Sequence, residues 1–250
     1  MIQLTILGSA DAFNGTGRGN SCYLVEDPGG TYAVDFGPTA MVACRRLGFD
    51  PTRLDAIYLT HLHGDHIGGI AQLFIDQQYH ARRDRPLIIA GPPGTEGRIA
   101  SLIDVSYPSV PREGLRFPLI FKRYTVPGQV EVLGRKVSTI RARHDSAAIA
   151  TSLRIDAHGR ALAFSGDTGW QDDLLKLSDG AHLFVCECSN ADPGFWGHLS
   201  VTEIAARRAD FQVGRMVLTH LSEASRPQAT ARAHEMNVDI ADDGLVFHVS

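Results

Sequence analysis

The sequence predicts an α/β protein in which helices cover the outer faces of two packed β-sheets, a four-layer αββα sandwich. Apolar runs of strand length alternate with segments of helical period along the whole chain. The 250 residues, 44% of them hydrophobic, are enough to bury the core of such a sandwich. No linker or repeat marks an internal domain boundary. We therefore expect one domain that spans residues 1–250.

The expected strands are short apolar runs that turn residues separate. They fall at 2–7, 21–26, 31–35, 56–60 and 87–90, more densely between 116 and 164, and then at 183–188, 215–219 and 245–249. Helical patterns interrupt them at 38–47, 67–79, 95–105, 169–178, 200–213 and 225–236. Because helices recur between strands in both halves of the chain, we place them on the two outer faces.

The most informative segment carries four side chains of metal-ligand type within six residues. His61, His63, Asp65 and His66 follow directly after the apolar run 56–60. His61 and His63 alternate along the emerging backbone and can converge on one ion, whereas Asp65 and His66 can face a second. The segment therefore predicts a metal site at the carboxyl end of a strand.

This arrangement resembles the HxHxDH signature of the metallo-β-lactamase superfamily. The resemblance implies the same αββα sandwich and three further ligands downstream. His144, Asp167 and His220 occur in the expected order, each after an apolar run. By resemblance, one metal is held by His61, His63 and His144, the other by Asp65, His66 and His220, and Asp167 bridges both.

The expected ligand set determines the chemistry. Five histidines and two aspartates suit two divalent ions, zinc above all, and manganese or iron(II) could occupy the same set. Two such ions leave a charge of about +2 after the two carboxylates, so the pocket attracts anions although the chain has a formal net charge of −4. We expect hydrolysis of a phosphodiester through a metal-bridging hydroxide, with Asp65 among the catalytic residues as well as the ligands.

A second segment, at 197–200, indicates the acid that such a reaction needs. Ser200 and Glu203 have the spacing of a capping box, which places His198 just before the amino terminus of a helix. This segment resembles the ribonuclease Z branch of the superfamily, whose histidine assists phosphodiester cleavage. By the same resemblance, Glu187 at a strand end could orient His198; an ordinary loop histidine is the open alternative.

Two glycine-rich turns extend the resemblance over most of the chain. The segments 8–24 and 90–94 are similar to the opening loop and the Gly-Pro turn of that branch. Turn glycines alone are weak evidence. Ser146, just after the expected ligand His144, could donate a hydrogen bond to a substrate phosphate, although a turn serine is the preferred interpretation.

The substrate class follows from what the chain lacks. Branch members that process transfer RNA usually carry a long basic Gly/Pro-rich arm, and no such insertion lies between 95–105 and the strands after 116. The isoelectric point is about 6.2, and the arginine clusters are short. We expect a small anionic phosphodiester or nucleotide rather than structured RNA. The alternatives are a lactonase or β-lactamase-type acyl hydrolase, a ribonuclease Z-type tRNA 3′ endonuclease, and a non-catalytic metal-binding effector.

The remaining expectations concern location and assembly. No long apolar span and no signal-peptide pattern occur, so we expect a cytoplasmic enzyme without a membrane partner. The four cysteines are expected to pack in the core rather than to form disulfides. A homodimer stays open.

Overall fold

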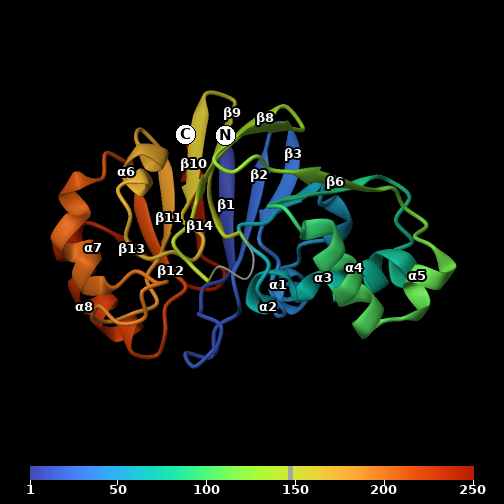
Figure 1. Cartoon of the computed structure of the whole chain (residues 1–250), viewed down its shortest axis with the longest axis horizontal. Coiled ribbons are helices and arrows are strands. Elements are labelled where there is room, and N and C mark those ends of the chain that lie inside the picture. Colours follow the sequence, from blue (N-terminus) through green and yellow to red (C-terminus); the bar gives the residue numbers. More distant parts are fainter. Residues whose placement is uncertain (146–148) are drawn as a thin grey trace.

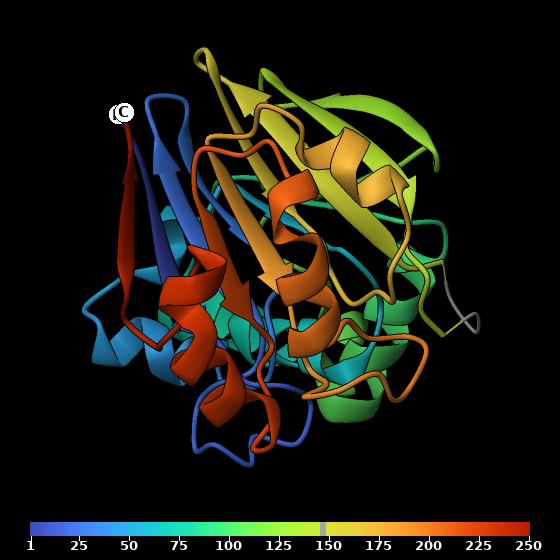
Figure 2. The ribbon, with the colours of Figure 1, turned by 90° about the vertical axis from the view of Figure 1, so that its left-hand side faces the viewer.

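The computed structural model describes residues 1–145 and 149–250, and Ser146 lies outside them. It contains two seven-stranded sheets packed face to face. Helices cover the outer faces of both sheets, as Figure 1 shows from the edge and Figure 2 after a quarter turn. This arrangement confirms the predicted αββα sandwich.

The first sheet has the order β14-β1-β2-β3-β4-β5-β6. Its strands are β1 (Ile2–Gly8), β2 (Cys22–Asp27), β3 (Gly30–Val34), β4 (Ala56–Tyr58), β5 (Leu87–Gly91), β6 (Leu119–Arg123) and β14 (Val246–Val249). The strands β3 to β6 run parallel, whereas β14, β1, β2 and β3 pair antiparallel. The last strand therefore pairs with the first, and the two termini lie side by side in Figure 1.

The second sheet has the order β13-β12-β11-β10-β9-β8-β7. Its strands are β7 (Gly128–Val132), β8 (Arg135–Arg141), β9 (Thr151–Ala157), β10 (Arg160–Phe164), β11 (Leu183–Glu187), β12 (Met216–Thr219) and β13 (Asp239–Ile240). The strands β10 to β13 are parallel, and β7 to β10 are antiparallel. Parallel strands are buried on both faces, which explains the continuous apolar runs of β10, β11 and β12.

The helices form the two outer layers. The first sheet is covered by α1 (Ala40–Arg46), α2 (Gly64–Ile67), α3 (Gly69–Ile75), α4 (Thr95–Ser106) and α5 (Ser109–Glu113). The second is covered by α6 (Asp173–Ser178), α7 (Val201–Arg207) and α8 (Ser225–Met236). One apolar cluster lies between the sheets and one under each helix layer. None of the helices in the described ranges is long and apolar enough to cross a membrane.

Some predicted element bounds were wrong. The helix expected over 67–79 begins at Gly64, so that Asp65 and His66 of the ligand motif lie in its first turn, and it ends in a π-helical segment, Asp76–His80. The helix expected from residue 169 begins at Asp173, because Gly169 is tied to the centre by its N–H, which donates to the carbonyl of Arg143. The helix α5 and the strand β13 were not predicted, since segments of five and two residues are too short to show a period.

A buried ion pair joins the two sheets at the end of the sandwich opposite the carboxyl ends of β3 and β4. Arg135 Nη2 lies 2.6 Å from Asp27 Oδ1, and Arg135 Nε lies 2.9 Å from Asp27 Oδ2. Their side chains are 1% and 0% exposed. The guanidinium also lies over the ring of Tyr32, 4.8 Å from its centroid. This end of the interface therefore has its buried charges fully paired.

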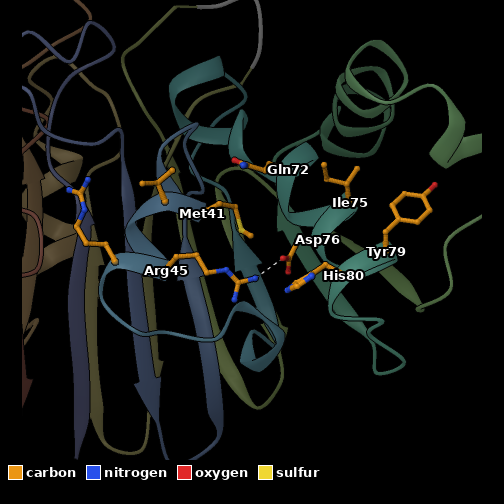
Figure 3. Close-up of a pocket in the computed structure, with 9 residues that line it drawn as sticks. Met41, Arg45, Gln72, Ile75, Asp76, Tyr79 and His80 are labelled. Atoms are coloured by element: carbon orange, nitrogen blue, oxygen red, sulfur yellow. Dashed lines mark hydrogen bonds and ion pairs between the residues drawn. The ribbon is translucent and has the colours of Figure 1, made fainter.

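A large hollow lies on the outer surface, between α1 and the helices that follow it (Figure 3). Its volume is about 720 Å³, and Arg45 and Asp76 form an ion pair across it at 2.6 Å. Within the described ranges, no group of side chains placed to hold a metal borders this hollow. The candidate site therefore lies elsewhere.

Candidate metal centre

The seven side chains expected to bind metal meet at one edge of the sandwich. His61, His63, Asp65 and His66 follow β4, Asp167 follows β10 and His220 follows β12, all at the carboxyl ends of parallel strands. His144 follows β8 from the antiparallel part of the second sheet. The site is therefore built from both sheets.

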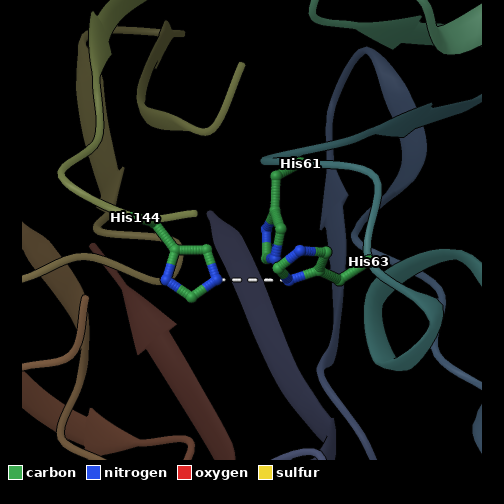
Figure 4. A group of neighbouring side chains, drawn as sticks. All are labelled: His61, His63 and His144. Atoms are coloured by element: carbon green, nitrogen blue, oxygen red, sulfur yellow. Dashed lines mark hydrogen bonds between the residues drawn. The ribbon is translucent and has the colours of Figure 1, made fainter. Parts of the chain in front are cut away.

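Three histidines form a first group. The ligand atoms of His61, His63 and His144 lie within 4.8 Å of one another, and Figure 4 shows the rings converging. His144 Nε2 is 3.2 Å from His63 Nδ1. The other nitrogen, His144 Nδ1, lies 2.9 Å from the carbonyl oxygen of Gly197. Because a carbonyl only accepts, Nδ1 carries the proton and Nε2 presents a lone pair to the group.

Two carboxylates and two histidines form a second group. The ligand atoms of Asp65, His66, Asp167 and His220 also lie within 4.8 Å of one another. Asp65 Oδ2 is 3.2 Å from His66 Nε2 and 3.3 Å from His220 Nε2. His66, Asp167 and His220 are buried, and Asp65 is only partly exposed. The group therefore offers two negative charges in a site of low dielectric.

Asp167 lies between the two groups. Its Oδ2 is 3.4 Å from His220 Nε2, 3.7 Å from His61 Nε2 and 3.8 Å from His144 Nε2. Its Oδ1 is 3.3 Å from His66 Nε2. One carboxylate is thus within reach of ligand atoms from both groups, which is the geometry that a shared ligand needs.

Buried nitrogens at this edge lack hydrogen-bond partners. Among the described residues, His61 Nε2, His66 Nε2 and His220 Nδ1 are removed from solvent and make no hydrogen bond of good geometry, although His66 Nε2 lies 3.2 Å from Asp65 Oδ2. Buried polar atoms are rarely left unpaired, because each costs about 1–3 kcal/mol. Imidazole nitrogens and carboxylate oxygens are ligands that zinc and similar divalent ions accept. The donor set therefore fits a metal.

Asp35 orients the second group, and the sequence analysis missed it. It follows β3, is 1% exposed, and accepts hydrogen bonds of 2.8 Å from the Thr60 N–H and hydroxyl. His66 Nδ1 donates to the same carboxylate at 2.8 Å, which leaves His66 Nε2 as the lone-pair nitrogen. The available signal was an aspartate at the end of an apolar strand, next to the strand that precedes the ligand motif.

The carboxylates change the protonation of the histidines. Burial lowers the pKa of His220, but the facing Asp167 and Asp65 more than offset this and raise it to about 9. Burial is likewise outweighed at His66, whose pKa Asp167, Asp65 and Asp35 raise well above its usual value. By contrast, burial and the charge of His66 hold the pKa of His61 well below normal. In the metal-free protein, protons on His66 and His220 therefore balance the two carboxylates, and a metal must displace them.

His198 and Glu187 form a pair beside the two groups. His198 Nδ1 lies 2.8 Å from Glu187 Oε1. Glu187, at the end of β11, also accepts backbone N–H groups of Thr168, Leu199 and Ser189. Burial lowers the pKa of His198, but the hydrogen bond and the charge of Glu187 raise it by more than burial lowers it. The pKa of His198 is therefore above its usual value. The pairing that the resemblance implied is present in the structure.

The capping box next to His198 is as predicted, but the structure also allows a second role for His198. Ser200 Oγ accepts the Glu203 N–H and Glu203 Oε2 accepts the Ser200 N–H, so the predicted capping box is confirmed. Ligand atoms of His198, His144 and Asp167 also lie within 4.8 Å of one another. Geometry alone therefore permits His198 to be either an acid or a ligand.

A cavity of about 260 Å³ opens over the centre. It is lined by Asp11, Ala12, Phe13, His63, Asp65, His144, Asp145, Asp167, Ser189, Phe195, His198 and His220. Both groups and the His198 imidazole thus face one space. Its volume is below the roughly 300–1,000 Å³ of pockets for drug-sized ligands, so the space suits a small ligand.

The family model described as anti-Pycsar protein Apyc1 matches residues 2–242. The chain belongs to this family. A ribonuclease Z of Mycolicibacterium gilvum is 27% identical over 271 residues, which cover 97% of this chain and 94% of the relative. This similarity extends over nearly the full length of both proteins.

Solved structures share the fold. The metallo-β-lactamase fold protein YhfI from Bacillus subtilis superposes with a TM-score of 0.79 at 21% identity, over 99% of this chain and 100% of its own. The short form of human tRNase Z gives 0.80 at 21% identity, over 99% of each chain. A diphosphatase of the PhnP family gives 0.78 at 16% identity, over 100% and 98%. The metallo-β-lactamase fold, the likeness to ribonuclease Z and the expectation of a metal-dependent hydrolase are confirmed.

Proposed function

We propose that this protein is a binuclear metal-dependent phosphodiesterase that hydrolyses a small phosphodiester or nucleotide. The observation that carries the proposal is a shared carboxylate, Asp167, between two groups of ligand atoms that line one small cavity. A single structural ion would need only one such group. Two groups with a common ligand are what a two-metal hydrolase needs.

The proposal assigns the ligands as the resemblance implied. One ion would be held by His61, His63 and His144 and the other by Asp65, His66 and His220, and Asp167 lies within reach of both groups. Zinc is the first choice, with manganese or iron(II) as alternatives. Bound there, two divalent ions would supply a Lewis acid for phosphate oxygens and an activated water. Asp65 thereby contributes to catalysis through its ligand role.

His198 is proposed as the acid that protonates the leaving oxygen. Its raised pKa favours the protonated form over that of an ordinary histidine, and its imidazole lines the cavity. Glu187 stabilises that form through the 2.8 Å hydrogen bond to Nδ1. The proton to be transferred is then on Nε2. An acyl hydrolase of the lactonase type would leave this pair without a role.

Substrate size separates the remaining candidates. The cavity of about 260 Å³ favours a small substrate, and only the short helix α5 lies between α4 and β6, where an RNA-gripping arm would be expected. The ribonuclease Z and diphosphatase names of the relatives support a phosphate-containing substrate. A tRNA 3′ endonuclease and a non-catalytic metal-binding effector are the competing outcomes of the test below.

The proposal treats residues 1–250 as one hydrolase domain. Both sheets contribute ligands to the centre, and β14 returns to pair with β1. A half of the chain would therefore lack part of the ligand set. The proposal also locates the enzyme in the cytoplasm and allows a homodimer, which analytical ultracentrifugation would establish.

A substrate panel tests the proposed function. Zinc-loaded protein is assayed with bis(p-nitrophenyl) phosphate, nucleotide phosphodiesters, a lactone series, a β-lactam and a transfer RNA precursor. We expect turnover of the small phosphodiesters and none of the lactones or the β-lactam. Efficient cleavage of the precursor alone would favour the endonuclease, lactone turnover alone the acyl hydrolase, and no turnover at all the effector.

A further inference from the structure

Two exposed aromatic side chains line the cavity and a third lies beside one of them, and the proposed hydrolysis uses none of the three. Phe13 is 88% exposed, and Phe195 and Trp196 are each 51% exposed. Phe13 and Phe195 line the same cavity as the metal-centre histidines. The rings of Phe195 and Trp196 lie 5.5 Å apart. We call these three side chains the aromatic rim.

Exposed aromatic side chains are rare on the rest of the described surface. Among the described residues, the only other aromatic side chain that is exposed to a similar degree is Tyr79, beside the outer hollow of Figure 3. Most other aromatic rings lie in the three apolar clusters. Exposed apolar groups that gather at one place commonly mark a binding site.

Hydrogen bonds hold the loop that presents Phe13. This loop joins β1 to β2. Asp243 accepts the Ser9 hydroxyl at 2.8 Å and the Gly19 N–H at 2.7 Å, one at each end of the loop. The Phe13 N–H donates to Asp11 Oδ1 at 3.2 Å. The ring is therefore exposed on a fixed loop, which reduces the entropy lost when a ligand binds to it.

The loop that presents Phe195 is also packed closely against the metal centre. The carbonyl of Phe195 accepts hydrogen bonds from Asn190 Nδ2 and the His198 N–H, both at 3.1 Å. A Cβ at Gly197 would approach Phe195 Cε1 to 2.6 Å and His144 Nδ1 to 3.0 Å. Only glycine lets the phenyl ring pack here, where its centroid lies 6.5 Å from that of His144.

A planar aromatic group on the substrate matches this surface. A substrate whose phosphate lies at the two ligand groups extends its organic part to the rim, because both line one small cavity. Every nucleobase has a π-face that stacks on phenyl rings, whereas an aliphatic ester has none. The cavity has room for about one nucleotide unit.

We propose that Phe13 and Phe195 determine substrate specificity by stacking on the base of a nucleotide, with Trp196 supporting the Phe195 ring. This inference rests on the proposed phosphodiesterase function and adds the part of the substrate that is recognised. It makes the two phenylalanines binding residues that take no part in bond cleavage. Replacing them is therefore expected to raise KM and to leave kcat unchanged.

The test compares two substrates that differ only in the base. Zinc-loaded wild type, Phe13→Leu, Phe195→Leu and the double variant are assayed with a nucleoside 3′,5′-cyclic monophosphate and with the same cyclic phosphate on 1-O-methylribose. Leucine keeps an apolar side chain but removes the π-face. We expect KM for the nucleotide to rise about 5- to 150-fold in each single variant, and KM for the base-free ester to change less than about twofold.

Controls separate stacking from other causes. Tyr79→Leu removes the exposed aromatic ring away from the centre and should leave both KM values unchanged, and Phe195→Tyr should retain the wild-type KM. Calorimetric binding of a phosphorothioate cyclic nucleotide, which is cleaved slowly, should weaken by the same factor as KM rises. This binding measurement does not depend on turnover.

The outcomes distinguish this inference from the function on which it rests. Equal turnover of both substrates by wild type, with unchanged KM in the leucine variants, would overturn base stacking while phosphodiesterase activity stands. Absence of turnover of both substrates and of bis(p-nitrophenyl) phosphate would overturn the proposed function itself. A change of oligomeric state in the leucine variants, without a change in KM, would identify the rim as a contact between two copies and contradict the inference.

Discussion

At the carboxyl ends of β4, β10 and β12, buried imidazole nitrogens of His61 and His66 have no hydrogen-bond partners. At the opposite end of the sandwich, the equally buried Asp27 and Arg135 are joined by two hydrogen bonds. Both ends remove charged or polar groups from water, which is favourable only when partners are supplied. The paired end therefore stabilises the contact between the sheets. At the other end, the unpaired end, buried ring nitrogens stay without the partners that a bound metal would supply.

The largest effect is expected at the shared carboxylate. Asp167→Ala removes a ligand atom within reach of both groups, so we expect the protein to lose most of its bound metal and nearly all phosphodiester turnover. Elemental analysis and steady-state kinetics measure the two losses. Retention of full metal content and activity would mean that Asp167 is not shared.

A large loss of stability is expected at the opposite end, with little effect on catalysis. Arg135→Met leaves Asp27 buried without its partner, which costs about 3–5 kcal/mol of the free energy of unfolding. Urea denaturation of the zinc-loaded protein measures this cost. The double variant Asp27→Leu/Arg135→Met removes both charges and should lose less than the single variant.

The kinetic control for this pair is kcat, which should stay within about twofold of wild type below the unfolding transition, because the pair is remote from the cavity. A fall of kcat as large as that of a ligand variant would contradict the claim that the Asp27–Arg135 end contributes to stability and not to catalysis.

His198→Ala should leave the metals bound and slow the chemical step. Loss of a general acid lowers turnover of an alkyl phosphodiester by about 10²–10⁴-fold. A nitrophenyl ester should suffer less, because nitrophenolate leaves without protonation. Parallel kinetics with the two leaving groups, together with metal analysis, test the role. Equal losses would exclude protonation of the leaving oxygen, and loss of metal would make His198 a ligand.

The smallest effect concerns pH. Glu187 raises the pKa of His198, so turnover that needs protonated His198 falls only as pH rises through this raised pKa. Glu187→Gln removes the negative charge, and the basic limb of the kcat profile for an alkyl ester should therefore move to lower pH. The nitrophenyl ester serves as the internal control, because its basic limb should not move. A shift to higher pH would contradict the assigned pairing.

The two ends also differ in how well the sequence predicted them. The ligands at 61–66 lie within one short segment, and the resemblance supplied His144, Asp167 and His220. Asp35 was missed because it acts through Thr60 and His66, which become its neighbours only when β3 and β4 pair. The residues of the Asp27–Arg135 pair are 108 positions apart. No local pattern indicates that contact.

The elements show the same limit. Buried parallel strands appear in the sequence as continuous apolar runs, and most were predicted within a few residues. The rim residues Phe13 and Phe195 lie on loops that have no period. Their meeting at one cavity depends on how the β1–β2 loop and the loop before α7 fold over the centre. Periodicity therefore predicts the layers, whereas the loops that complete the site become visible only in three dimensions.

The central claim, that the unpaired end is a two-metal hydrolytic centre, is tested most directly by titrating metal-free protein with zinc while following bis(p-nitrophenyl) phosphate turnover and proton release. The account predicts that activity saturates at about two ions per chain and that near-neutral binding releases protons, because His66 and His220 must lose theirs. Saturation at one ion per chain, or full activity without metal, would contradict it.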